Sequence, residues 1–123
     1  MEPIEALSRL RQLAGVKRDA EVAAMERLRA EIRALEGQIE ALDEASVDWL
    51  SAQDAATAYQ RAGRDGVWDM WRVGRTRELG MRIAQLRADL ERQSLATRRS
   101  VGRHQAIAKL VERHGPGPGR RGD

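Results

Sequence analysis

The sequence contains no cysteine and no phenylalanine, and aromatic residues make up only 3% of its 123 residues. Without cysteine the chain can form no disulfide, holds no thiolate nucleophile and lacks the commonest ligands of structural zinc. This absence is typical of proteins from reducing compartments, and we expect a cytoplasmic location. No apolar run approaches the ~20 residues that span a bilayer, so no transmembrane segment is expected. The acidic, amphipathic start, MEPIEALSRL, is unlike a secretory signal.

Residues in patterns that support catalysis or cofactor binding are also scarce. His104 and His114 stand apart from any carboxylate at a metal-ligand spacing, so neither is expected to bind a metal. The GRDG stretch at 63–66 lacks the spacing and the Lys-Ser/Thr pair of a phosphate-binding loop. No serine has a partner that would activate it as a nucleophile. We therefore expect a non-enzymatic protein with no cofactor, no metal and no small-molecule substrate.

Charged residues, by contrast, are abundant, at 33% of the chain, and their signs are unevenly divided. Residues 1–60 carry 7 basic and 12 acidic side chains, a net charge of −5, whereas residues 61–123 carry 15 and 7, a net charge of +8. A composition rich in charge, Leu, Ala and Arg is typical of long helices and coiled coils. The opposite signs of the two halves predict two segments that pair with each other.

Apolar residues recur at steps of 3 and 4 through the first half of the chain. The row consists of Met25, Leu28, Ile32, Leu35, Ile39, Leu42, Ser46, Trp49, Gln53 and Ala56. A repeat of 3.5 residues indicates the seam of a coiled coil rather than the broader stripe of a globular helix. Upstream, Lys17, Arg18 and Glu21 interrupt the apolar pattern, which predicts a stutter between about residues 15 and 24.

The second half carries a matching row. It consists of Leu79, Ile83, Leu86 and Leu90, then a polar patch of Gln93, Thr97 and Ser100, then His104, Ile107 and Val111 in the same register. A polar residue on such a seam usually fixes which residues face each other, and His104 is interpreted in this way.

A break between the two rows completes the predicted architecture. The glycines at 63 and 66 predict a turn over about 61–67, between helices over about 4–60 and 68–114. The expected fold is therefore all-α, a long antiparallel two-helix coiled-coil hairpin occupying residues 1–114. The ending GPGPGRRGD, residues 115–123, cannot continue a helix and predicts a disordered tail.

The predicted turn also sets a predicted register. Folding about residue 64 would place residue i opposite residue 129 − i. Leu42 would then face Leu86, and Leu35 would approach Gln93. The first helical turns would project beyond the end of the second helix.

The few aromatic residues gather around the predicted turn. Tyr59, Trp68 and Trp71 flank it, and Trp49 lies upstream on the seam, where we expect it to pack against the 79–81 region. Trp68 and Trp71 are three positions apart and cannot both face one seam. An exposed aromatic side chain supplies a large apolar contact area at low entropic cost. At least one of these two residues is therefore a candidate for contact with a partner.

Three segments resemble the FliJ family, the soluble stalk proteins of the flagellar type III export apparatus, and its injectisome relatives. They are ALSRLRQLAGVKRDAEV at 6–22, QIEALDEASVDWL at 38–50 and WDMWRVGRTRELGMRIAQLRADL at 68–90. The resemblance covers residues 5–114, and length, turn position and aromatic placement add to it. The family's further aromatic residues are replaced here by Ala45 and Arg75.

The resemblance implies a rod-shaped protein that connects two parts of the export apparatus and also escorts export chaperones. The end with both termini would enter the export ATPase hexamer, and the opposite part would contact the membrane export gate, at the cytoplasmic face of the inner membrane. The implied gate-facing residues are Gln38, Leu42, Trp49, Leu79 and Leu86, with Trp68 and Trp71 as aromatic candidates beside them. The implied ATPase-facing residues are Leu7, Leu10, Leu13, Arg18, Arg103, Ile107, Leu110 and Arg113.

Two alternatives remain open at this point. The chain could be a generic coiled-coil adaptor or scaffold, in which two extended chains dimerise. A pI near 10.1 and clustered arginines also fit a nucleic-acid-binding protein. That second alternative is less favoured, because the basic residues alternate with acidic ones, as in Arg87-Ala-Asp-Leu-Glu91, and no nucleic-acid-binding module is present.

Overall fold

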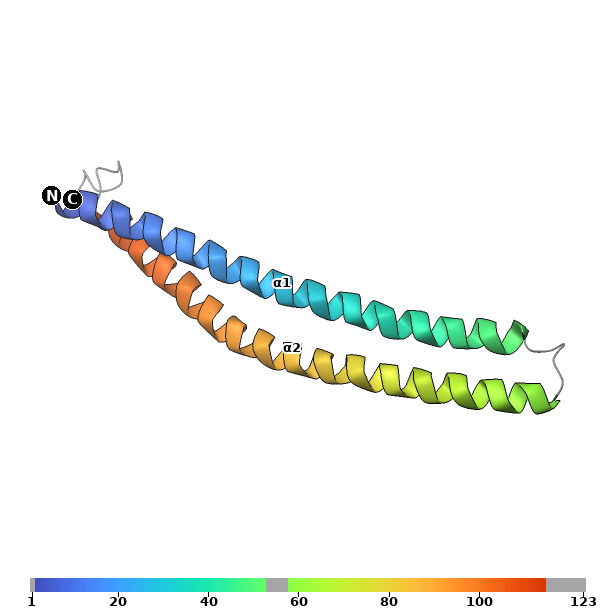
Figure 1. Ribbon diagram of the computed structural model, residues 1–123. Coiled ribbons are helices and arrows are strands. Elements are labelled where there is room, and N and C mark those ends of the chain that lie inside the picture. Colours follow the sequence, from blue (N-terminus) through green and yellow to red (C-terminus); the bar gives the residue numbers. More distant parts are fainter. Residues whose placement is uncertain (1, 53–57, 115–123) are drawn as a thin grey trace. The chain divides into compact units, whose positions relative to one another are not determined.

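The computed structural model describes residues 2–52 and 58–114, with side chains at 2–46 and 66–114. Two helices account for this part of the chain, α1 at Pro3–Ala52 and α2 at Ala58–His114, and it contains no strand. The two helices run antiparallel, so that the start of α1 lies beside the end of α2 (Figure 1). The predicted all-α antiparallel hairpin is therefore confirmed. The predicted disordered tail, 115–123, lies outside the described residues.

The ends of both helices carry residues that suit them. Pro3 occupies the first position of α1, where its missing N–H costs nothing, and Glu5 lies in the first turn, where a carboxylate interacts favourably with the helix dipole. The Ala6 backbone N–H donates to the Glu2 carbonyl oxygen at 3.1 Å. At the other end, Arg113 and His114 lie in the last turn of α2, where positive charge is favourable.

The predicted turn is in the wrong place. Residues 61–67 are helical, and α2 begins at Ala58, while α1 ends at Ala52 instead of near residue 60. Gly66 shows no positive φ and has no neighbour within 4 Å of the position where a Cβ would lie. A glycine inside a helix costs about 1 kcal/mol relative to alanine. That cost weakens a helix without ending it.

The register is shifted accordingly. Facing pairs have residue numbers that add up to 113 on one side of the seam, as in Gln38–Arg75 and Glu31–Arg82, and to 123 on the other, as in Glu36–Arg87. The seam between them therefore has a sum near 118, in place of the predicted 129. The facing residue thus lies about 11 positions earlier on α2 than predicted, a displacement of about three turns. Leu42 lies with Trp71 rather than opposite Leu86. The first turns of α1 lie beside the end of α2 (Figure 1), where Ser8 and Val111 line the same depression.

The two predicted seams are confirmed wherever side chains are described. From Met25 to Ser46 every predicted seam residue of α1 is buried or half-buried, and every position between them is exposed. On α2 the predicted row from Leu79 to Val111 is buried or half-buried throughout, with Leu86 only 2% exposed. The polar members Thr97 and Ser100 are as deeply buried as the leucines, at 6% and 4% exposure.

The predicted stutter does not occur. Upstream of Met25, the less exposed residues include Leu7, Ala14, Arg18 and Glu21, which continue the same seven-residue repeat. Two charged side chains therefore sit on the seam itself. They remain there because polar side chains of α2 face them, as described below.

Contacts between the helices divide the hairpin into two units, which we describe separately. Unit 1 combines residues 1–27 with 90–123, and unit 2 is the continuous segment 28–89.

Candidate partner-binding surfaces

Ion pairs beside the seam fix the pairing of the helices in unit 2. Arg82 lies 3.6 Å from Glu31, and Arg87 lies 2.9 Å from Glu36. Each pair joins a basic side chain of α2 to an acidic side chain of α1, as the opposite charges of the two halves predicted. In an antiparallel coiled coil, positions that flank the seam on the same side face each other, and these contacts follow that rule. Each exposed pair is worth about 0–1 kcal/mol.

Unit 1 has a polar cluster on its seam instead. Arg18 Nη1 lies 3.1 Å from His104 Nδ1, and the His104 ring lies 3.5 Å from where a Cβ of Gly15 would be. One turn further along α1, the Gln93 amide donates to the Glu21 side chain and to the Glu21 carbonyl oxygen, the latter at 3.2 Å. Because a partly buried polar group is costly unless it is paired, these contacts specify which residues face each other.

The same cluster includes a buried hydroxyl group. Thr97 Oγ1 lies 2.8 Å from the Gln93 carbonyl oxygen, one turn back along α2, and 3.2 Å from the Glu21 carbonyl oxygen across the seam. The predicted role of His104 as a polar seam residue that contacts the facing helix agrees with its observed position.

The predicted gate-facing residues fall into three groups. Leu79 and Leu86 are 3% and 2% exposed, so they pack in the seam and are not available to a partner. Gln38 and Trp71 are exposed, and Leu42 and Trp68 are half-buried. The backbone of Trp49 belongs to α1, but its side chain lies outside the described residues, as does that of Tyr59.

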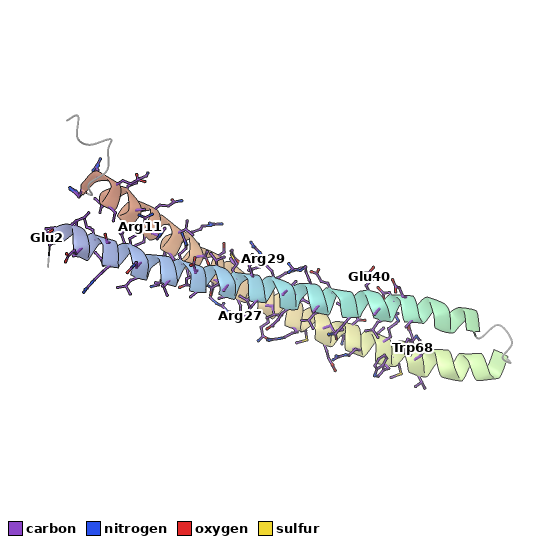
Figure 2. All side chains as sticks on the ribbon, turned by 90° about the horizontal axis from the view of Figure 1, so that it is seen from above. Glu2, Arg11, Arg27, Arg29, Glu40 and Trp68 are labelled. Atoms are coloured by element: carbon purple, nitrogen blue, oxygen red, sulfur yellow. The ribbon has the colours of Figure 1, made fainter. Side chains whose placement is uncertain are left out.

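A shallow depression of about 250 Å³ joins the accessible members of this set. It is lined by Gln38, Ala41, Leu42, Trp71, Arg75 and Leu79. Arg75 donates to the Gln38 side-chain oxygen at 3.5 Å across its rim. The Trp71 ring lies 5.3 Å from the Trp68 ring, tilted by 30°, and Trp68 projects from α2 in Figure 2. An apolar floor with a few polar groups at the rim is the chemistry of a protein contact site.

Exposed apolar side chains continue along α2 beside this depression. Val67, Met70, Trp71 and Met81 share the outer side of the helix, and Met70 is 79% exposed. Such a row is uncommon on a surface that meets only water. The prediction included Trp71 but missed Val67 and the two methionines. The sequence did show that Val67 lies three positions before Met70 and four before Trp71, a spacing that places all three on one side of a helix.

The predicted ATPase-facing residues all belong to unit 1, but they differ in accessibility. Leu10, Leu13, Arg103, Leu110 and Arg113 are exposed. Leu7 and Ile107 are half-buried seam residues, and Arg18 is half-buried against His104. The exposed members combine apolar and cationic side chains, whereas the other three hold the helices together.

A second depression in unit 1 is broad and open, with a volume of about 970 Å³. Among the residues that line it are Arg11, Gly15, His104 and Val111, and Arg11 projects from α1 in Figure 2. Among residues 2–52 and 58–114, no three His, Asp or Glu side chains gather in a way that could hold a metal ion. Neither described helix contains a stretch that is apolar enough, over sufficient length, to cross a membrane.

Comparisons with known proteins give no significant match. The sequence matches no family model, and no curated protein and no solved structure is significantly similar to it.

Proposed function

We propose that this chain is a non-enzymatic coiled-coil stalk of a flagellar or related type III protein export apparatus. In this role it promotes assembly of the export ATPase ring and couples the ring to the membrane export gate. The observation that carries the proposal is a two-helix coiled coil that leaves large apolar side chains exposed in both units, Leu13 in one and Trp71 in the other. The resemblance of three sequence segments to the FliJ family supports the identity of the two partners.

The contact with the ATPase ring is assigned to unit 1. Leu10, Leu13 and Leu110 offer apolar area, and Arg103 and Arg113 offer positive charge to acidic loops of a ring. A stalk that works inside a rotating or wobbling ring needs contacts that are electrostatic and readily exchanged, because a tight contact would lock one state.

The contact with the export gate is assigned to the depression around Trp71 in unit 2. Trp71 is half exposed, at 54%, and Gln38 and Leu42 lie beside it on α1. Leu79 and Leu86 support this surface from within the seam and do not touch the partner. A location at the cytoplasmic face of the inner membrane, and export chaperones as further partners, follow from the resemblance alone.

The decisive experiment measures the ATP hydrolysis rate of the cognate export ATPase with and without this protein, at about one chain per hexamer. We expect a clear stimulation that Leu10→Asp and Leu13→Asp abolish. Both side chains are exposed, so these variants should keep their helical content, which circular dichroism checks. Met81→Asp is the matched control, because it places the same charge on an exposed apolar site of unit 2 and should leave the stimulation intact.

An unchanged hydrolysis rate, with the ATPase active and the hairpin folded, would refute the stalk role and favour the generic adaptor. Loss of stimulation in Met81→Asp as well as in Leu10→Asp would refute the assignment of the ATPase contact to unit 1.

A further inference from the structure

The cations of α2 are neutralised differently in the two units. In unit 2, Arg72, Arg82 and Arg87 each lie within 4 Å of a carboxylate of α1. In unit 1, the arginines 98, 99, 103 and 113 and Lys109 make no ion pair or hydrogen bond with any carboxylate among the described side chains, 2–46 and 66–114. The positive charges of these five side chains are therefore not neutralised by the described carboxylates of the hairpin.

Counting in steps of seven residues along each helix identifies the residues that lie beside these cations. Glu31 and Arg82 face each other on one side of the seam in unit 2. Successive steps of seven from these two positions lead, in unit 1, to Ala24, Lys17 and Leu10 on α1 and to Ala96, Arg103 and Leu110 on α2. Within unit 1 these positions lie on one side of its own seam, which runs through Ala14, Arg18 and Glu21 on α1 and Thr97, Ser100 and His104 on α2. No carboxylate is among them.

The next row outward on the same side has the same character. It contains Leu13 and Ala20 on α1 and Arg99, Ala106 and Arg113 on α2, all exposed. We define the basic-apolar face as the members of the two rows from Leu10 to Ala24 on α1 and from Arg99 to Arg113 on α2. They are Leu10, Leu13, Lys17, Ala20 and Ala24 of α1 with Arg99, Arg103, Ala106, Leu110 and Arg113 of α2.

The spacing of this face is that of a second seam. On α1 its members follow one another at steps of 3, 4, 3 and 4, and on α2 at steps of 4, 3, 4 and 3. Rows with a 3.5-residue repeat pack against helices, because they stay on one side of a supercoiled partner over many turns. A two-helix hairpin with a second row of this kind on each helix can accept a third helix alongside.

We propose that the basic-apolar face binds an acidic amphipathic helix of a partner protein, which packs as the third helix of a coiled coil. Its apolar residues contact Leu10, Leu13 and Leu110, and its carboxylates lie against Lys17, Arg99 and Arg103. The charge on the face is of one sign. In unit 2, α2 already packs against an acidic helix. The α1 segment that pairs with it there carries Glu31, Glu36 and Asp43.

A helix fits this face better than nucleic acid does. Phosphate backbones are bound by clustered cations and gain nothing from a regular apolar row, whereas here leucines and alanines alternate with the cations at helical spacing. The inference stands on the face itself and does not depend on the export role, although the face shares five residues with the proposed ATPase contact, namely Leu10, Leu13, Arg103, Leu110 and Arg113.

The test uses the full chain and a synthetic acidic peptide of about three heptads, with Leu and Ala at the a and d positions and Glu at e and g. A control peptide has the same apolar row and Lys in place of Glu. Fluorescence anisotropy of labelled peptide measures the affinity. We expect the acidic peptide to bind at least about tenfold more tightly than the basic one, and less tightly as ionic strength rises.

Variants then locate the contact. Leu13→Asp and the double substitution Arg99→Glu with Arg103→Glu should each weaken binding of the acidic peptide about tenfold or more. The double substitution Arg98→Glu with Lys109→Glu is the matched control, because it reverses two exposed cations of the same helix outside the defined face, and it should bind nearly as well as the parent. Circular dichroism and urea unfolding verify that each variant keeps its fold.

Equal binding of the two peptides, or equal effects of the Arg98–Lys109 and Arg99–Arg103 variants, would overturn the proposal. It would also be overturned if the acidic peptide failed to bind while an oligonucleotide or anionic vesicles bound and lost affinity in the same variants. Because the assay contains no ATPase, its failure is distinguishable from failure of the proposed stalk role.

Discussion

Leu86 offers the sharpest test of the seam, because it is the most deeply buried large side chain in the described part of the chain. Truncation to alanine removes its apolar area and leaves a cavity, which in protein cores costs about 2–5 kcal/mol. A two-helix seam is thinner than a globular core, and solvent can reach part of the space. We therefore expect Leu86→Ala to lower the free energy of unfolding by about 2–3 kcal/mol.

The matched control is Leu95→Ala, which makes the same chemical change on the same helix at a side chain that is 49% exposed. This variant should cost about 0.5 kcal/mol or less. Urea unfolding followed by circular dichroism at 222 nm measures both. With a denaturant slope of about 1–2 kcal/mol/M, Leu86→Ala should shift the midpoint downward by about 1–2 M, whereas Leu95→Ala should barely move it. Equal midpoints for the two variants would refute the assignment of Leu86 to the interior of a closed hairpin.

Two further predictions concern features that the seam does not include. Gly74→Ala and Gly102→Ala should each raise the free energy of unfolding by about 0.5–1 kcal/mol in the same urea assay. Both glycines are helical, and nothing lies within 4 Å of an added Cβ. A loss of stability in both variants would contradict the helical assignment. A double-mutant cycle on Glu31→Gln and Arg82→Gln should give a favourable coupling free energy of up to about 1 kcal/mol that fades in high salt, since the pair is 3.6 Å apart and half exposed. An unfavourable coupling at low salt would contradict the register.

The seam could be predicted from the sequence because it depends on a local, repeated spacing. Ile32, Leu79 and Ile83 are buried for the same reason that they were recognised, namely their steps of 3 and 4. The predicted stutter was wrong because Arg18 and Glu21 were judged by their charge alone. Whether a charged residue can occupy a seam depends on what faces it, and His104 and Gln93 come from the other end of the chain.

The turn and the register could not be predicted, for a related reason. Gly63 and Gly66 lower the propensity of a helix by about 1 kcal/mol each, which is less than long-range pairing supplies. Once the turn was misplaced by several residues, every facing pair moved with it. The candidate surfaces were affected in a different way. The resemblance named Leu79 and Leu86 as gate-facing, although the spacing had already placed both on the seam, where they are buried.

The division into two units has a consequence for biosynthesis. Unit 2 is a continuous stretch of 62 residues, from Leu28 to Asp89, so all of it has been synthesised before the last turns of α2 are made. The α1 segment of unit 1 can pair only after residues 90–114 have followed. During translation the pairing therefore starts within unit 2 and ends in unit 1. The leucines near the start of α1 stay uncovered longest, which is when a chaperone would be needed.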